Sequence, residues 1–303
     1  MNWKGKEVLV TGGAGFIGSH LTKRLLKEGA HVTVLDDFSY GKKENIPSDC
    51  DIVVGDVSNR QNSNQIKEVD YIFHFGAPSS VILFNKNPRA CIHSTICGFA
   101  NILEWGKQIS VKKLIYPSSG SVYGDAPPPQ SENVLPKPKN LYGICKLTCE
   151  LLAKKYSEVP SVGLRIFAGY GPGEEHKGDF SSVITLFLNL ILKNEPPIVY
   201  GNGTQSRDFV YIDDVIDAIL SAAERDVNGE IINVGSGKAY SFNEVVSIIN
   251  HLTGKNVEPV FVNKPANYLE NTLADIKKMK ELLGVNPLDL EEGLKKYLQR
   301  VIK

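Results

Sequence analysis

A tyrosine and a lysine stand four residues apart in the segment NLYGICK, at Tyr142 and Lys146. The segment lies just before a helical pattern, and on a helix positions i and i+4 share a face. The ammonium group of Lys146 would then lie beside the phenol of Tyr142, where a positive charge favours the phenolate form. Such a pair can exchange a proton with a substrate hydroxyl. Because Tyr-x-x-x-Lys also arises by chance as a solvated surface pair, the rest of the chain has to decide between the two interpretations.

A glycine-rich segment, TGGAGFIG, places Gly12, Gly15 and Gly18 at three-residue intervals. A strand-like run precedes it and a helical pattern follows, the setting in which glycines let a dinucleotide pyrophosphate approach the backbone and a helix N-terminus. Asp36 ends the next strand-like run, about 20 residues on, where an acidic residue commonly binds the ribose. Its carboxylate would accept hydrogen bonds from a ribose diol and repel a 2′-phosphate. This segment therefore predicts NAD rather than NADP, although the lysines at 42–43 leave NADP open.

The elements that would position these residues alternate between strand and helix. Strand-like runs are EVLVTGG, HVTVLDD, DIVVGD, YIFHFGA, KLIYPSS and VGLRIFA, and helical periodicity is found in SHLTKRLLKEG, over 88–107 and over 141–157. This alternation is typical of an α/β fold, with a Rossmann-type doubly wound parallel sheet and helices on both faces. We predict a NAD-binding Rossmann domain over 1–168. The regularity then breaks, so 169–303 is expected mainly to form a smaller α/β substrate domain, with 209–235 returning to the first.

Charge and composition exclude several classes of protein. The 303 residues include 34 basic and 34 acidic ones, which gives no electrostatic reason to expect nucleic acid or an anionic membrane as a partner. The longest apolar run, 183–192, is too short to span a bilayer, and we see no secretory signal. The five cysteines are odd in number without a C-x-x-C pair, which favours reduced thiols in the cytoplasm. The histidines are scattered without metal-ligand spacing, so we expect no metal site.

Six segments together carry a resemblance to a known family: TGGAGFIGSHL, VLDDFSYG, GDV, PSSGSVYGD, YGICK and QSRDFVYIDDV. Over residues 8–298 the chain resembles the extended short-chain dehydrogenase/reductases, and within them the NAD-dependent nucleotide-sugar epimerase/dehydratase group that includes the UDP-glucose 4-epimerases. The resemblance implies that Tyr142 is the catalytic acid/base. It also implies that Lys146 holds the nicotinamide ribose and favours the tyrosinate, and that Ser119 hydrogen-bonds the reacting sugar hydroxyl.

The resemblance further implies which residues bind the substrate and the cofactor. Substrate would contact Ser119, Tyr142 and Arg207, and the Arg207 guanidinium would bind the nucleotide diphosphate. Ser118 and Ser121 compete with Ser119, and the alternative for Arg207 is an ion pair with the aspartate that follows it. Asp56, assigned to the adenine, could instead be a strand-end turn residue. The residues implied to bind NAD are Gly12, Gly15, Phe16, Ile17, Gly18, Asp36, Asp37, Asp56, Val57, Gly76, Ala77, Tyr142 and Lys146.

The chain also departs from the family pattern. Ala168 stands where many relatives have an asparagine that contacts the sugar or the diphosphate. The segment 264–270, KPANYLE, replaces the usual Arg-x-Gly-Asp, and Thr95 replaces a common asparagine. The first two departures concern the substrate side. After Ser119, dehydratases of this family carry Asp-Glu and decarboxylases a glutamate, whereas this chain has Gly120-Ser121.

Together these features predict NAD-dependent epimerisation of a nucleotide sugar, at C4 of a UDP-hexose, through a transient 4-keto sugar. The alternatives are a 4,6-dehydratase or decarboxylase built on the same scaffold, and a catalytically silent NAD-binding regulator. The nucleotide sugar would bind mainly to 169–303. In relatives, the helices corresponding to 88–107 and 141–157 pair across a two-fold axis, so we expect a homodimer.

Overall fold

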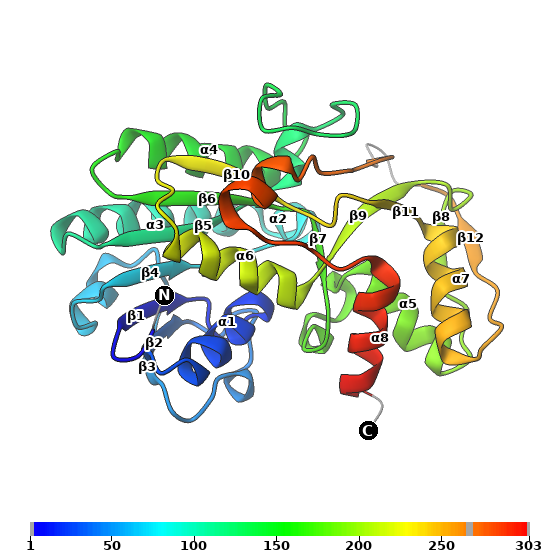
Figure 1. Cartoon of the computed structure of the whole chain (residues 1–303), viewed down its shortest axis with the longest axis horizontal. Coiled ribbons are helices and arrows are strands. Elements are labelled where there is room, and N and C mark those ends of the chain that lie inside the picture. Colours follow the sequence, from blue (N-terminus) through cyan, green and yellow to red (C-terminus); the bar gives the residue numbers. More distant parts are fainter. Residues whose placement is uncertain (1–2, 265–268, 302–303) are drawn as a thin grey trace.

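A parallel sheet at the centre of the chain carries the predicted alternation of strands and helices. The computed structural model describes residues 3–264 and 269–301. Its larger sheet has the strand order β10-β6-β5-β4-β1-β2-β3, and neighbouring strands run parallel (Figure 1). The strands are β1 (Glu7–Thr11), β2 (His31–Asp36), β3 (Asp51–Val54), β4 (Tyr71–His74), β5 (Lys113–Ser119), β6 (Ser161–Ile166) and β10 (Glu230–Val234). The predicted Rossmann-type α/β fold is confirmed.

Helices cover both faces of this sheet (Figure 1). The pairs that pack together are α1 (Phe16–Lys27) with α6 (Ile212–Glu224), and α3 (Pro88–Gln108) with α4 (Leu141–Lys155). Side chains alternate between the faces of a strand. Accordingly, Val8 and Val10 of β1 join the apolar cluster of α1 and α6, whereas Leu9 joins the cluster of α3 and α4. Apolar residues on both sides of a strand are what a sheet covered on both faces requires.

The strand order reverses at β1, and this reversal places the site. β2 and β3 lie on one side of β1, and β4 and β5 lie on the other. Connections that leave the carboxyl ends of β1 and β4 run in opposite directions, which opens a crevice where ligands bind in folds of this kind. The glycine segment after β1, Gly76 after β4 and Ser119 at the end of β5 all lie at this edge.

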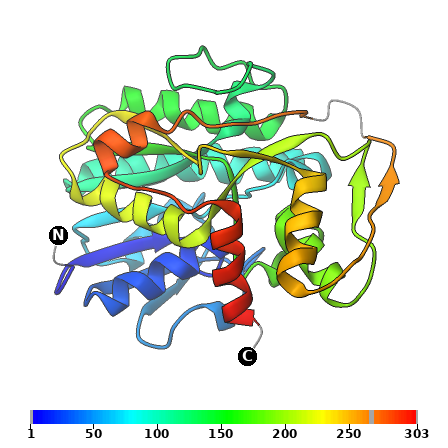
Figure 2. The ribbon, with the colours of Figure 1, turned by 45° about the vertical axis from the view of Figure 1, so that its right-hand side comes forward.

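Most of the chain after residue 168 forms a smaller α/β part beside the central sheet (Figure 2). Its sheets have the orders β11-β9-β7 and β12-β8. The elements are β7 (Ala168–Tyr170), α5 (Val183–Leu192), β8 (Ile198–Tyr200), β9 (Ser206–Tyr211), β11 (Ala239–Ser241), α7 (Phe242–Thr253), β12 (Val260–Val262) and α8 (Leu290–Val301). Between β9 and β11, α6 and β10 return to the central layers. One apolar cluster runs through both parts and includes Leu25 of α1, Ile219 of α6 and Phe187 of α5.

Short helical turns complete the chain. They are η1 (Lys43–Asn45), η2 (Arg60–Gln65), α2 (Val81–Lys86), η3 (Gly120–Tyr123), η4 (Glu175–Phe180) and η5 (Met279–Leu283). Across the residues described here, none of the helices has the length and apolar character needed to cross a bilayer.

Candidate active site

A cavity of about 1090 Å³ lies between the carboxyl ends of the central strands and the smaller α/β part. Pockets for a single small molecule usually occupy roughly 300–1,000 Å³, so this cavity lies at the upper end of that range. All the residues assigned above to cofactor and substrate line its wall, from Gly12 in the first loop to Arg207 on β9. The fold therefore gathers residues from seven separate segments around one space.

The glycine segment turns tightly between β1 and α1. Gly12 has φ +71°, and a Cβ on it would collide with the carbonyl oxygen of Phe75. A Cβ on Gly18 would collide in turn with the carbonyl oxygen of Gly12. Gly15 is the N-cap of α1, and no side chain caps the helix there. The first backbone N–H groups of α1 can therefore bind an anion, which fits the pyrophosphate of NAD.

Asp36 stands at the end of β2 with its carboxylate at the cavity wall. Its two oxygens accept hydrogen bonds from the backbone N–H of Ala14 at 2.9 Å and of Phe38 at 2.8 Å. Burial raises the pKa of this carboxyl, because desolvation disfavours the charged form, and the two N–H donors oppose the shift. Each oxygen can still accept a further hydrogen bond, as a ribose diol requires. Neither of the lysines at 42–43 lines the cavity.

Asp56 makes a turn contact, as in the alternative that the sequence left open, and it also lines the cavity. One carboxylate oxygen accepts from the backbone N–H of Ser58 at 2.8 Å, which is a turn contact after β3. The residue also lines the cavity beside Val57. A turn that fixes this side chain is compatible with a contact to a ligand.

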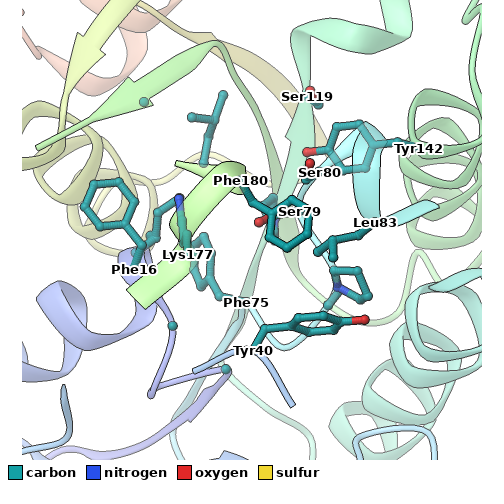
Figure 3. Close-up of a pocket in the computed structure, with 18 of the residues that line it drawn as sticks. Phe16, Tyr40, Phe75, Ser79, Ser80, Leu83, Ser119, Tyr142, Lys177 and Phe180 are labelled. Carbon is teal, nitrogen blue, oxygen red and sulfur yellow. The ribbon is translucent and has the colours of Figure 1, made fainter. Parts of the chain in front are cut away.

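Tyr142 and Lys146 lie on the cavity face of α4. Asn140 caps the helix by accepting from the backbone N–H of Gly143 at 2.8 Å, which places Tyr142 in the first turn. The Tyr142 ring packs edge-on against Phe84, with ring centroids 5.6 Å apart. Lys146 is only 4 % exposed, and its Nζ lies 5.7 Å from the centroid of the Tyr142 ring. The Tyr142 hydroxyl points into the cavity on the side where Ser119 lies (Figure 3). The lysine is thus a buried cation behind the phenol rather than a solvated surface charge.

The serines at the end of β5 have different partners. Ser118 Oγ donates to Glu150 of α4 at 2.5 Å, so its proton is engaged in the protein interior. Ser119 Oγ accepts from the backbone N–H of Ser121 at 3.2 Å, which leaves its own proton free to meet a ligand in the cavity. Because neighbouring residues of a strand face opposite sides, one of the two had to point inward. This geometry favours Ser119 over Ser118.

A buried ion pair fixes α4 against the strands that carry Ser119. Arg165 of β6 donates to both carboxylate oxygens of Glu150, at 2.8 and 2.7 Å. Both side chains are almost completely buried. Buried charges are tolerated when they are paired and hydrogen-bonded in good geometry. Together with the hydrogen bond from Ser118, this ion pair fixes α4, which carries Tyr142 and Lys146, against the end of β5.

His74 at the end of β4 is a positioning residue. Its Nδ1 lies 2.9 Å from Thr11 Oγ1, and that hydroxyl accepts from the backbone N–H of Gly76 at 3.0 Å. Complete burial, and to a lesser extent the positive charge of Lys146, lower the pKa of His74 to about 3. The imidazole is therefore neutral near pH 7 and supplies no catalytic proton. It holds the loop after β4 against the end of β1.

Arg207 on β9 lines the cavity from the smaller α/β part of the chain. Its guanidinium donates to the carbonyl oxygens of Ser206, Leu269 and Glu270, at 2.8, 2.6 and 3.0 Å. The Asp208 carboxylate accepts instead from backbone N–H groups at 236, 237 and 274, which argues against the alternative of an ion pair with Arg207.

The three departures from the family pattern lie in different surroundings. Ala168 lines the cavity, whereas Thr95 is buried and its hydroxyl has no partner within the described chain. Of the segment 264–270, residues 265–268 lie outside the described residues, and Leu269 lines the cavity.

Several cavity residues carry no signal in the sequence. They stand in loops and short turns rather than in a motif, and only the fold brings them to the wall: Tyr40, Ser79, Ser80, Leu83, Lys177 and Phe180 (Figure 3). Such residues are hard to recognise in a sequence, because loop residues that bind ligands follow no regular spacing and are positioned by the scaffold.

The chain is similar over most of its length to known proteins. The family model described as the NAD dependent epimerase/dehydratase family matches residues 8–235. A putative UDP-glucose 4-epimerase of Methanocaldococcus jannaschii is 36% identical over 96% of this chain and 97% of that protein. A UDP-N-acetyl-alpha-D-glucosaminuronate decarboxylase of Bacillus cytotoxicus is 33% identical over 97% of each chain. The crystal structure of UDP-glucose 4-epimerase with UDP-glucose from Thermotoga maritima is similar with a TM-score of 0.93, at 31% identity over 98% of this chain and 100% of that one.

Proposed function

The chain belongs to the NAD-dependent epimerase/dehydratase family, and on this basis we propose that it epimerises a nucleotide sugar at C4 of a UDP-hexose. The reaction would pass through a transient 4-keto sugar. The observation that carries this proposal is the single space shared by Ser119, Tyr142 and Lys146 with the glycine segment. A proton-transfer group and a dinucleotide site on one cavity wall are what reversible oxidation of a hydroxyl needs.

Each residue has a defined task in this reaction. When bound, NAD supplies the hydride acceptor and returns the same hydride to the sugar carbon. Tyr142, as tyrosinate, removes the proton from the sugar O4 and later gives it back. Lys146 lies behind the Tyr142 ring and would hold the nicotinamide ribose. Ser119 donates a hydrogen bond to the sugar oxygen and holds it near Tyr142.

Arg207 would hold the nucleotide diphosphate while the keto sugar turns over between the two hydride transfers. An arginine fork matches paired phosphate oxygens. Carbonyl contacts fix the guanidinium group, and Arg207 lines the cavity wall. Binding energy from a part of the substrate that does not react would then support the reaction. We also propose that 1–168 forms the cofactor domain and that most of 169–303 forms the substrate domain.

The carboxylates of the cavity argue against a lyase. Elimination of water across C5 and C6 needs a base and an acid beside the sugar. Within the described chain, the carboxylates at the wall are Asp36, Asp37, Asp56 and Glu174. The three aspartates follow β2 and β3, on the side of Asp36, and Glu174 already accepts hydrogen bonds from two hydroxyls and an ammonium group. The positions after Ser119 hold glycine and serine, which supply no carboxylate.

We expect UDP-glucose, incubated with the enzyme in deuterated buffer, to be converted reversibly to its C4 epimer without deuterium on any ring carbon. Direct return of the hydride leaves no step at which a solvent proton reaches carbon. The measurement is NMR and mass spectrometry of the products, with UDP-N-acetylglucosamine and the two uronic acid counterparts run in parallel. Deuterium at C5 or C6 together with loss of water or CO₂ would favour the dehydratase or decarboxylase and contradict the epimerase.

We also propose that the protein is a homodimer that pairs through α3 and α4. Leu141, Ile144 and Leu151 form an exposed apolar stripe along α4, at 39%, 45% and 58% exposure. An exposed apolar surface on a helix often marks a contact with another chain. Light scattering should therefore give twice the 33.3 kDa chain mass. A monomer at micromolar concentration would contradict this assignment.

The reducing cytoplasm is the compartment that we propose. All five cysteines are free thiols, three of them buried, and free thiols persist where the surroundings are reducing. Fractionation of the source cells would test this, and recovery of the protein outside the cytoplasmic fraction would contradict it.

A further inference from the structure

The segment 174–182 contacts both sides of the cavity, and none of the roles above uses it. Gly178, with φ +53°, interrupts the η4 turn and separates its two ends. On one side of this kink, Lys177 lies over the Phe16 ring of α1. On the other side, Phe180 packs against the apolar cluster that contains Leu83 and Phe84 of α2. Figure 3 shows both side chains in the cavity, Lys177 beside Phe16 and Phe180 near Leu83.

Buried hydrogen bonds fix the start of this segment to α5. Glu174 is 1% exposed and accepts from Ser182 Oγ at 2.6 Å and from Thr185 Oγ1 at 2.8 Å. It also accepts from Lys177 Nζ at 2.6 Å. These contacts hold the ammonium group of Lys177 in place before any ligand arrives. Such preorganisation lowers the entropic cost of binding.

The ammonium group of Lys177 lies beside the side chain of the first residue of α1. Its Nζ lies 4.4 Å from the centroid of the Phe16 ring, and Phe16 is the first residue of α1. An ammonium group has three N–H donors, and the bond to Glu174 uses one of them. The backbone N–H groups of α1 approach a bound diphosphate from the side of the helix. Lys177 contacts the Phe16 ring from the smaller α/β part of the chain.

We propose that Lys177 binds the diphosphate of the dinucleotide cofactor and closes the anion site from the side opposite α1. The proposal rests on the proposed function only in taking NAD as that dinucleotide. The diphosphate of the nucleotide sugar is the other possible source of the same chemistry, but the proposed function assigns it to Arg207. Epimerisation needs the cofactor to stay bound between two hydride transfers, and a cation on the covering segment would retain it there.

Calorimetric titration of the purified protein, stripped of bound cofactor, separates the two diphosphates. The probes are NAD, ADP-ribose, which keeps the diphosphate but lacks nicotinamide, and UDP. Lys177→Met should lower the affinity for NAD and for ADP-ribose by about tenfold, since a charge-assisted hydrogen bond is lost. UDP affinity should stay within about twofold, which also establishes that the variant is folded. Lys177→Arg keeps the charge and should remain within about threefold of wild type for all three probes.

Lys43→Met is the matched control, because Lys43 is an exposed lysine on the same side of the molecule that does not line the cavity. It should leave all three affinities unchanged. Unchanged NAD binding in Lys177→Met would overturn the proposal, and weaker UDP binding with unchanged NAD would assign Lys177 to the substrate instead. If Lys177→Met does not fold, Lys177→Gln is judged by the same criteria. A wild type that binds UDP but neither NAD nor ADP-ribose would contradict the proposed function itself, a result distinct from either outcome in the variant.

Discussion

Tyr142→Phe is expected to lose at least about 10²-fold in turnover, because the ring stays and the proton-transfer group is removed. Packing should persist, since the edge-on contact with Phe84 involves the ring and not the hydroxyl. The substrate should therefore still bind, and the loss should fall on kcat rather than on KM. Steady-state kinetics with a UDP-hexose measures both, and circular dichroism checks the fold.

Tyr156→Phe is the control for this variant. Tyr156 caps the other end of the same helix, and its hydroxyl donates to Glu104 at 3.0 Å, away from the cavity. Near-normal turnover is expected there. Lys146→Met should also lower turnover, because the side chain proposed to hold the nicotinamide ribose is lost. Near-normal turnover in Tyr142→Phe would mean that another group transfers the proton, and Tyr142 would then be only a packing residue of α4.

Asp36→Ala is expected to reduce the preference for NAD over NADP by at least about tenfold. In the wild type, the carboxylate would bind the ribose diol of NAD and meet a 2′-phosphate with like charge in a partly desolvated place. The variant loses the attraction for one cofactor and the repulsion for the other. Calorimetric affinities for NAD and NADP, measured on the same preparation, give the ratio.

The preference should also depend on pH, in a direction set by the raised pKa of Asp36. Above that pKa the carboxylate is charged, and the discrimination against NADP is at its maximum. As the pH falls through it, the group takes up a proton, the repulsion of a 2′-phosphate disappears, and the ratio falls. Asp51→Ala removes an exposed carboxylate at the start of β3 that does not line the cavity, and it should leave the ratio unchanged. A wild type that prefers NADP would show that the Asp36 assignment is wrong.

Local sequence was sufficient for much of the fold and for part of the site. Strand and helix periodicity gave the parallel sheet, because both faces of each central strand are buried against helices. The spacing of Tyr142 and Lys146 gave their common helical face, since four residues on a helix complete about one turn. The glycine segment also predicted a helix N-terminus open to a pyrophosphate, and α1 begins there without a side-chain cap. These features depend only on neighbours in the chain.

Contacts between distant segments needed the tertiary structure. Alternation along β5 required Ser118 and Ser119 to face opposite sides, but only the packing of α4 and β6, with Glu150 and Arg165, decided that Glu150 engages the hydroxyl of Ser118 rather than that of Ser119. Lys177 reaches Phe16 only because Glu174 fixes its segment to α5. Arg207 is held by carbonyl groups of residues near 270, whose placement no side-chain pattern encodes. Periodicity specifies which face of an element is buried, whereas the partner across that face is set by how separate elements pack together.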